Sequence, residues 1–137
     1  MLFLFSPSLA ATLSVSTSGP YTTIGSAIAA ASSGDTITVA AGTWSECIDF
    51  SGKDLAIEGA GIGTTTLAGG GSCTNAVTVD SGETASLSGL TITNTGMRAV
   101  YVSRSTLELD TVEVTDAGST SLIGAGVYVS EIGRAHV

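Results

Sequence analysis

The chain has little positive charge, few aromatic residues and no long apolar run. Lysine and arginine number 4 against 12 aspartates and glutamates, which gives a formal net charge of −8 over 137 residues. So few basic groups cannot neutralise a row of phosphates, which argues against nucleic acid and anionic membrane surfaces as partners. No stretch reaches the roughly 18 apolar residues of a membrane-spanning helix. The composition therefore predicts neither a nucleic-acid-binding protein nor a helical membrane protein.

Apolar residues and glycine are plentiful by contrast. Hydrophobic residues make up 43% of the chain, charged residues only 12%, and glycine occurs 18 times. This apolar share is too high for an intrinsically disordered chain, and the length fits one domain of ordinary size.

The two ends of the chain differ from its middle. Residues 1–11 are a short apolar run that ends in small residues, which predicts a partial signal peptide; a frayed first β-strand is the alternative. Removal of such a peptide would leave a mature chain that begins near Thr12 in an oxidising compartment. Residues 132–137 read as the translation of a widely used sequencing adapter in one frame, so we interpret them as a non-native tail. On that interpretation the protein is truncated after Glu131, and its lone histidine, His136, has no catalytic or metal role.

Short segments that alternate apolar and polar residues dominate residues 12–131, as in strands with one buried face. Strands are predicted at residues 37–39, 48–50, 55–57, 77–79, 90–92, 100–102, 107–109, 112–114 and 127–129. Residues 23–33 instead place four apolar side chains on one face of a short helix. Thr22 or Thr23 can cap the start of this helix, and Gly34 suits its end.

The strands recur as two families of similar sequence. The first family begins at residues 48, 77, 100 and 127, so it repeats after 29, 23 and 27 residues. The second begins at residues 55, 90 and 112, with spacings of 35 and 22. A period in the low twenties is one coil of a β-solenoid, in which each strand stacks on its counterpart in the next coil. The irregular spacings predict insertions at residues 59–72 and 119–124; a β-sandwich is the alternative, although it does not require the strand text to recur.

The helix predicted at residues 23–33 precedes the first full coil. The end coil of a solenoid exposes ladder groups and core side chains to water. An apolar helical stripe can cover them, so we expect an N-terminal helical cap.

Several segments near the N-terminus carry a family resemblance. They include a G-x-W-x-E step at residues 42–46 and a K-D-L-x-I-x-G-x-G step at residues 53–61. These segments resemble the N-terminal cap and first coils of right-handed parallel β-helix proteins of the pectin-lyase-like superfamily, and the two steps resemble the start of pectin methylesterases. The later repeats are similar to those of polymorphic outer-membrane and other β-helix surface proteins. The resemblance covers about residues 12–130 and implies an all-β, right-handed parallel β-helix.

The resemblance implies no catalytic residue in this chain. Pectin methylesterases carry an aspartate pair, glutamines and an arginine on later coils, whereas this chain has no glutamine, and Arg98 and Arg104 lie in no recognisable catalytic context. We therefore expect a non-catalytic, secreted or cell-surface β-helix module that works in adhesion, display or contact with a polysaccharide or host glycan. The alternative is the N-terminal part of a pectin esterase or lyase whose catalytic coils are missing. An open last coil would also favour edge-to-edge self-association.

The two cysteines, Cys47 and Cys73, are candidates for a disulfide. An even number of cysteines in an exported chain suggests a disulfide. Their separation of 26 residues is close to one coil, so they can lie on neighbouring rungs. Two separate buried thiols are the alternative, and a metal site is not expected without a usable histidine.

A set of carboxylates suggests calcium binding. The alternation places Glu108, Asp110 and Glu113 on outward positions, with Asp80 and Glu83 one coil earlier. Oxygen-rich clusters suit Ca²⁺, but a solvated acidic face is the simpler interpretation. No cofactor and no metal ligand is therefore assigned from the sequence.

Two further motifs have structural interpretations. The glycine-rich residues 59–63 lack the third glycine and the following helix of a dinucleotide fingerprint, so we interpret them as a turn between coils. Asn94 and Asp116 follow equivalent strands, where such residues can form a hydrogen-bonded ladder on a turn.

The aromatic and threonine positions have a functional and a structural interpretation each. Trp44 can serve as a stacking platform for a sugar, but packing against the cap is the expectation. Outward threonines suggest an ice-binding face, which their irregular spacing disfavours; they are Thr36, Thr38, Thr91 and Thr93.

Overall fold

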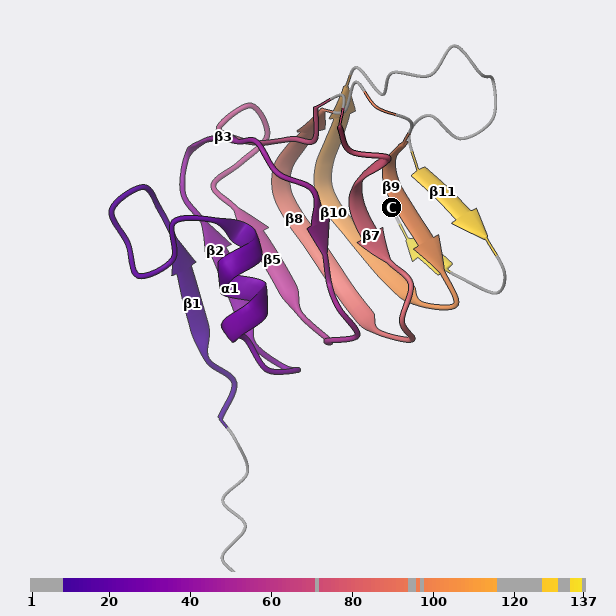
Figure 1. The fold of residues 1–137 in the computed structure, drawn as a ribbon, viewed down its shortest axis with the longest axis horizontal. Helices are drawn as coiled ribbons and strands as arrows, with labels where there is room; N and C mark the ends of the chain where they lie inside the picture. The colour runs from indigo at the N-terminus through magenta and orange to yellow at the C-terminus, as the bar shows by residue number, and fades with distance from the viewer. Residues whose placement is uncertain are drawn as a thin grey trace, which may run out of the picture.

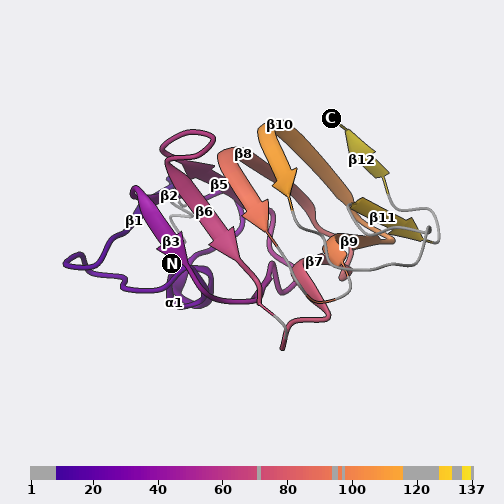
Figure 2. The same ribbon diagram turned by 90° about the horizontal axis from the view of Figure 1, so that it is seen from above.

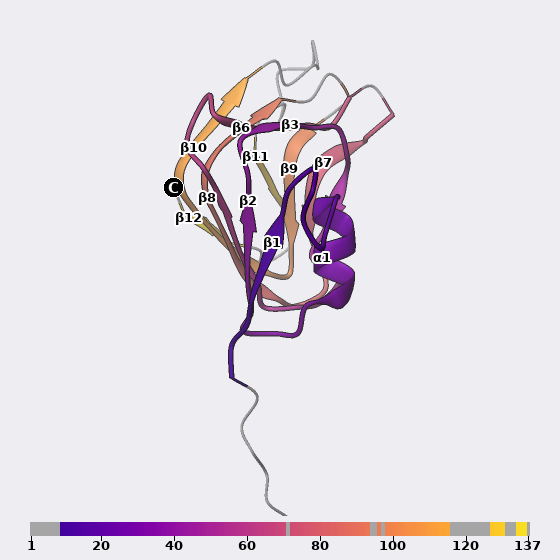
Figure 3. The ribbon, with the colours of Figure 1, turned by 90° about the vertical axis from the view of Figure 1, so that its left-hand side faces the viewer.

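The computed structural model describes residues 9–70, 72–93, 96 and 98–115, with the backbone of residues 127–130 and 134–136. Over these residues the strands follow one another around a common axis for about four turns and form an all-parallel β-solenoid (Figure 1). Seen from the N-terminal end, the chain runs clockwise as it recedes from the viewer, so the coils are right-handed (Figure 3). The repeats thus predicted the fold class correctly.

The described part contains twelve strands and one helix. In chain order they are β1 (Thr12–Val15), α1 (Ile24–Ala30), β2 (Thr36–Val39), β3 (Gly42–Trp44), β4 (Ile48–Asp49), β5 (Ala56–Gly59), β6 (Thr65–Ala68), β7 (Asn75–Val79), β8 (Thr84–Thr93), β9 (Arg98–Ser103), β10 (Thr106–Thr115), β11 (Val127–Ser130) and β12 (Arg134–His136).

The strands form three faces around the core. The first face runs β1-β2-β5-β8-β10-β12, of which β8 and β10 contribute their first halves. The second face consists of β3, β6 and the second halves of β8 and β10, whose ends lie side by side when seen from above (Figure 2). The third face is a separate sheet with the order β4-β7-β9-β11.

The corner between the first and second faces depends on residues in the left-handed region. Gly89 in β8 has φ 63° and Thr111 in β10 has φ 53°, a conformation that glycine adopts without strain. In the preceding coil, a Cβ on Gly59 would collide with the carbonyl oxygen of Gly89. Glycine is therefore required where these two coils approach at the corner.

The third face confirms the first family of repeats. Ile48 pairs with Val77, which pairs with Val100, and Val100 pairs with Val127. Since these residues occupy the same position in successive coils, the predicted spacings of 29, 23 and 27 residues are the lengths of the coils.

The second family of repeats is wrong in one member. Leu90 pairs with Val112 as predicted, but Ile57 pairs with Leu87 rather than with Ile92. The reason is that apolar residues alternate on both sides of the corner within β8. Similar sequences therefore occur on two different faces, and the sequence pattern alone does not show which face a strand joins.

The predicted insertion at residues 59–72 is also corrected. Its glycine-rich start is a turn, as expected, with Gly61 at φ 142° and Gly63 at φ 72°. The strand β6 follows and pairs with β3 and β8, so the segment supplies a second-face strand. The insertion predicted at residues 119–124 lies outside the described residues.

Buried side chains form ladders along the axis of the solenoid. On the first face, Leu13, Ile37, Ile57, Leu87 and Leu109 lie in register from coil to coil and are all buried. Each coil thus adds one rung of the same apolar stack, which is the packing that the alternating pattern predicts.

The helix α1 lies beside β1, β2 and β4, on the third-face side of the first coil (Figure 3). Thr23 is its N-cap and accepts a hydrogen bond from the Ser26 N–H at 3.1 Å. Ile24, Ala27 and Ile28 are buried against the core. The helix is shorter than the predicted 23–33, since the chain is already extended at its C-cap, Ala31.

Two charged side chains from the next coil hold the helix at its ends. The Glu46 carboxylate accepts hydrogen bonds from the N–H groups of Ile24 and Gly25, both at 2.8 Å. The Lys53 ammonium donates to the carbonyls of Ile28 at 2.6 Å and Ala29 at 3.1 Å. Each charge has the sign that complements its end of the helix dipole. We call this pair, Glu46 and Lys53, the helix clamp.

Candidate functional site

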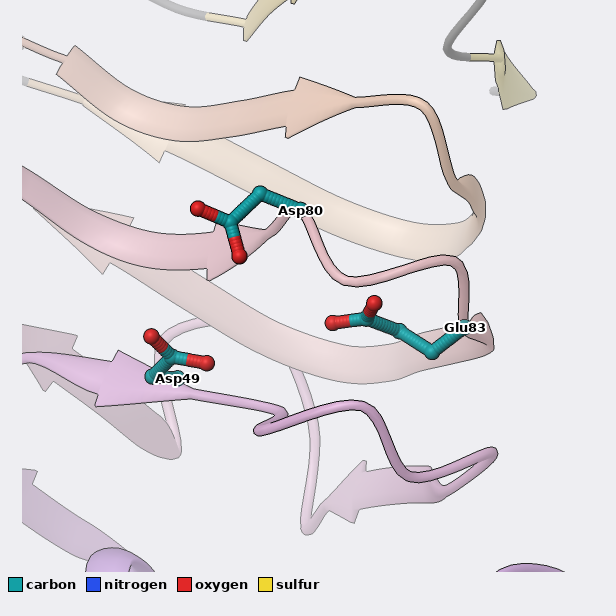
Figure 4. A group of neighbouring side chains, drawn as sticks. All are labelled: Asp49, Asp80 and Glu83. Atoms are coloured by element: carbon teal, nitrogen blue, oxygen red, sulfur yellow. The ribbon is translucent and has the colours of Figure 1, made fainter.

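Three carboxylates from two neighbouring coils meet at one end of the third face. Asp49 ends β4, Asp80 directly follows β7, and Glu83 directly precedes β8. One carboxylate oxygen of each residue lies within 4.8 Å of those of the other two. Figure 4 shows the Glu83 side chain directed toward the two aspartates. We call this group, Asp49, Asp80 and Glu83, the carboxylate cluster.

Tight turns after β4 and β7 bring the three residues together. Asp49 accepts a hydrogen bond from the Ser51 N–H at 2.7 Å, and Ser51 and Gly52 then take φ values of 55° and 76°. A Cβ placed on Gly52 would lie 3.6 Å from the Cβ of Ser81, so the turn lies close to that of the next coil. The stacked turns thus place the residues that flank them at the same corner of the solenoid.

Glu83 is the buried member of the cluster, with 2% of its surface exposed. Its Oε2 atom accepts hydrogen bonds from the Ser81 N–H at 2.6 Å and the Ser105 hydroxyl at 3.1 Å. Its Oε1 atom is buried and has no hydrogen-bond partner among the described residues. Buried carboxylate oxygens are normally paired, so Oε1 stands out as an acceptor that the described part of the chain does not satisfy.

The two aspartates connect the cluster to solvent. Asp49 is exposed and Asp80 is half-buried. Asp80 accepts a hydrogen bond from the Ser81 hydroxyl at 3.1 Å. Together with Ser81, Gly82 and Arg104 it lines an open depression of about 380 Å³. A small ligand can therefore reach the cluster from outside.

The carboxylates that the sequence pointed to are only partly brought together. Asp80 and Glu83 belong to the cluster, whereas Glu108, Asp110 and Glu113 do not. Glu108 and Asp110 are exposed on β10. Glu113 lies beyond the corner on the second face, where it accepts a hydrogen bond from Thr91 at 3.3 Å. Within the described ranges no second group of three such side chains comes as close.

Sequence reasoning missed Asp49. Asp49 and Asp80 each introduce a Ser-Gly turn, in the stretches 49–52 and 80–82. That repeated turn text, one coil apart, was the available signal. Alternation alone shows which face a residue lies on, but it does not show which turns stack.

Cys47 and Cys73 form a disulfide with a Cα–Cα distance of 5.8 Å. Cys47 lies just before β4 and Cys73 just before β7. The disulfide and the carboxylate cluster therefore connect the same two coils, one before the paired strands and the other after them.

The remaining candidates have structural roles or lie outside the described residues. Trp44 is buried in the core and donates from Nε1 to the Ala40 carbonyl at 3.1 Å, so it is no platform for a sugar. The threonines proposed for an ice-binding face are divided between the first-face strand β2 and the second-face half of β8. Asn94 and Asp116 are not among the described residues, and only the backbone of His136 is.

Among the carboxyls of the described residues, that of Asp35 has a shifted pKa, and its role is structural. Asp35 accepts hydrogen bonds from the N–H groups of Ser32 and Ala11, both at 2.8 Å. These bonds, with a smaller contribution from the Lys53 charge, hold the pKa of Asp35 below its ordinary value of 3.8. The carboxylate thereby joins the residue before β1 to the segment after α1.

The relationship of this chain to other proteins rests on its fold and its motifs. Within the described residues no helix is long and apolar enough to cross a membrane. Neither a scan against protein-family models nor a search of curated proteins finds a match for the chain. The resemblance to the pectin-lyase-like superfamily therefore rests on the motifs and on the parallel β-solenoid.

Proposed function

We propose that the chain is a non-catalytic β-solenoid module of a secreted or cell-surface protein, and that it contacts glycan through its third face. The observation that carries this proposal is a polar and aromatic patch on β7 and β9. Asn75 lies opposite Arg98, and Thr78 lies opposite Tyr101, in adjacent parallel strands. All four side chains are partly exposed. We call these four residues the third-face patch.

The chemistry of the third-face patch suits a sugar. The Arg98 guanidinium lies 5.5 Å from the centroid of the Tyr101 ring, which fixes the ring by a cation–π contact. Such a ring offers an apolar surface with a polar tip. Asn75 donates to the Thr78 hydroxyl at 3.3 Å, while its Oδ1 atom is buried and finds no donor among the described residues. A sugar hydroxyl can supply that missing donor.

The disulfide supports export. Disulfides persist in oxidising compartments and are rare in the cytosol, and Cys47 is exposed where a reductant could reach it. The enzyme alternative gains less support, because Glu46 and Lys53, the charged residues of the methylesterase-like steps, hold the helix α1. An esterase and a non-enzymatic solenoid need such a cap alike.

Binding of the full chain to a panel of pectic and host-type glycans tests the proposal. We expect Tyr101→Ala to weaken binding by roughly fivefold to tenfold, as loss of an aromatic contact does. Thr38→Ala, on the first-face strand β2, is the matched control and should leave binding unchanged. Absence of glycan binding, or equal binding by Tyr101→Ala, would overturn the proposal. Release of methanol or unsaturated products from pectin would establish the enzyme alternative instead.

A further inference from the structure

Glu83 is an acidic group whose burial the described residues account for only in part. It is 2% exposed, and within the described part of the chain one of its two carboxylate oxygens has no hydrogen-bond partner. A buried carboxylate is strongly disfavoured unless it is paired or bound to a metal ion. Its carboxylate is directed toward two more carboxylates, those of Asp49 and Asp80 (Figure 4), which adds like-charge repulsion.

Lys53 does not neutralise the cluster. Lys53 follows the turn that Asp49 introduces, and its coil lies directly beside that of Glu83. Its ammonium, however, is directed to the carbonyls of Ile28 and Ala29 at the end of α1. Arg104 lines the adjoining depression with Asp80, at the exposed side of the cluster, whereas Oε1 of Glu83 is buried.

We propose that Asp49, Asp80 and Glu83 bind one Ca²⁺ ion. Calcium takes oxygen ligands at about 2.3–2.6 Å, so ligands on opposite sides of the ion lie about 4.6–5.2 Å apart. The three carboxylate oxygens, all within 4.8 Å of one another, fit that span. Magnesium requires ligands at about 2.0–2.1 Å and would have to draw the three side chains inward. Glu83 supplies its unpartnered Oε1, and the open depression admits the waters that complete the coordination.

The proposed ion joins two coils whose third-face strands share few residue pairs. β4 is two residues long and shares only the pairs Ile48–Val77 and Asp49–Thr78 with β7. The disulfide connects these coils before the paired strands, and the ion connects them after. Binding to the folded state alone stabilises it by RT ln(1 + [Ca²⁺]/Kd), which grows with the logarithm of the calcium concentration once that exceeds Kd. The ion is therefore a structural part of the third face, independent of what that face contacts.

Thermal unfolding and calorimetric titration of the chelator-treated, disulfide-bonded chain test this inference with calcium alone as the ligand. We expect one ion per chain and a dissociation constant of about 10⁻⁴–10⁻³ M, the range of extracellular calcium modules. The melting temperature should rise with calcium and respond less to the same concentration of magnesium. Absence of binding at several millimolar calcium would refute the proposal.

Variants of the cluster separate binding at this site from general charge screening. Glu83→Gln keeps the shape of the buried side chain but removes its charge, and it should abolish the calcium response. Asp80→Asn, at the half-buried edge, serves the same purpose if Glu83→Gln does not fold. Glu108→Gln removes an exposed acidic residue outside the cluster and should keep the full response. A calcium response of wild-type size in Glu83→Gln or Asp80→Asn would place the ion elsewhere.

Discussion

The helix clamp offers the sharpest test of how this solenoid begins. A helix of seven residues is too short to be stable by itself in water. Glu46 accepts two backbone hydrogen bonds at its start, and Lys53 donates two at its end. We expect Glu46→Gln and Lys53→Met each to lower the free energy of unfolding, because each removes a charge that complements the helix dipole.

The size of each effect follows from the bonds that are lost. A hydrogen bond to a charged group contributes about 1.5–3 kcal/mol when buried, but both side chains are half-exposed, so solvent reduces that contribution. Glu46→Gln keeps one acceptor and leaves one N–H unpaired, which gives a loss of about 1–2 kcal/mol. Lys53→Met leaves two carbonyls to water, which gives about 0.5–1.5 kcal/mol.

A double-mutant cycle then tells whether the clamp acts on a docked helix. The two ends of the helix are about 10 Å apart, so the two losses should add to within about 0.5 kcal/mol. If either single substitution undocks the helix, the second will add nothing. Urea unfolding followed by the fluorescence of Trp44, which is 7% exposed, measures all four free energies.

A matched control guards the interpretation of the cycle. Glu58→Gln removes an exposed acidic residue on β5 and should leave the free energy of unfolding unchanged within about 0.5 kcal/mol. If Glu58→Gln lowers stability as much as Glu46→Gln does, the effect is one of net charge and the clamp reasoning fails.

Three further predictions concern other parts of the solenoid. Replacing Cys47 and Cys73 by serine should lower the free energy of unfolding by about 3.5 kcal/mol, since the disulfide closes a loop with a sequence separation of 26 residues; urea unfolding measures this, and no change would refute it. The lowered pKa of Asp35 means that its stabilising contribution is present above pH 3.8 and is lost as the pH falls through the lowered pKa. Asp35→Asn should therefore lower stability at neutral pH and flatten its decline in acid, as melting temperatures across pH will show. Arg104→Asn removes a positive charge that shares a depression with Asp80, and asparagine tolerates the φ of 50° at that position; calcium affinity by calorimetry should rise roughly twofold to fivefold.

The third face was the most predictable part of the fold. Val77, Val100 and Val127 each begin the same three-residue sequence, a valine, a threonine or tyrosine, and a second valine, and their strands pair in the register that this repeat implies. The first and second faces were less predictable, since β8 and β10 cross a corner without interrupting their alternation. The short strands β3 and β6 each contain a single large apolar residue, Trp44 and Leu67, among small and polar ones, which is too little to show an alternation.

The carboxylate cluster shows where sequence reasoning about a site stops. Asp80 and Glu83 could be selected because the repeats place them one coil before the outward carboxylates of residues 108–113. Asp49 lies in the preceding coil, 31 residues before Asp80. Its approach to Asp80 and Glu83 depends on how the turns of the two coils stack. Glu113 is also a carboxylate at an outward position of its strand, but it lies beyond the corner at Thr111. Which carboxylates come together therefore depends on the geometry of the corners, and the alternation of apolar and polar residues does not encode that geometry.

The motifs that carry the family resemblance have a physical explanation in the cap. In the G-x-W-x-E step, Trp44 is buried and Glu46 binds the start of the helix. In the K-D-L step, Lys53 binds its end, and Asp54 accepts a hydrogen bond from the Thr84 N–H of the next coil at 2.6 Å. Both motifs therefore reflect how the helix cap is held on the first coils of this solenoid. The charged residues of both steps are thus accounted for by contacts within the first coils.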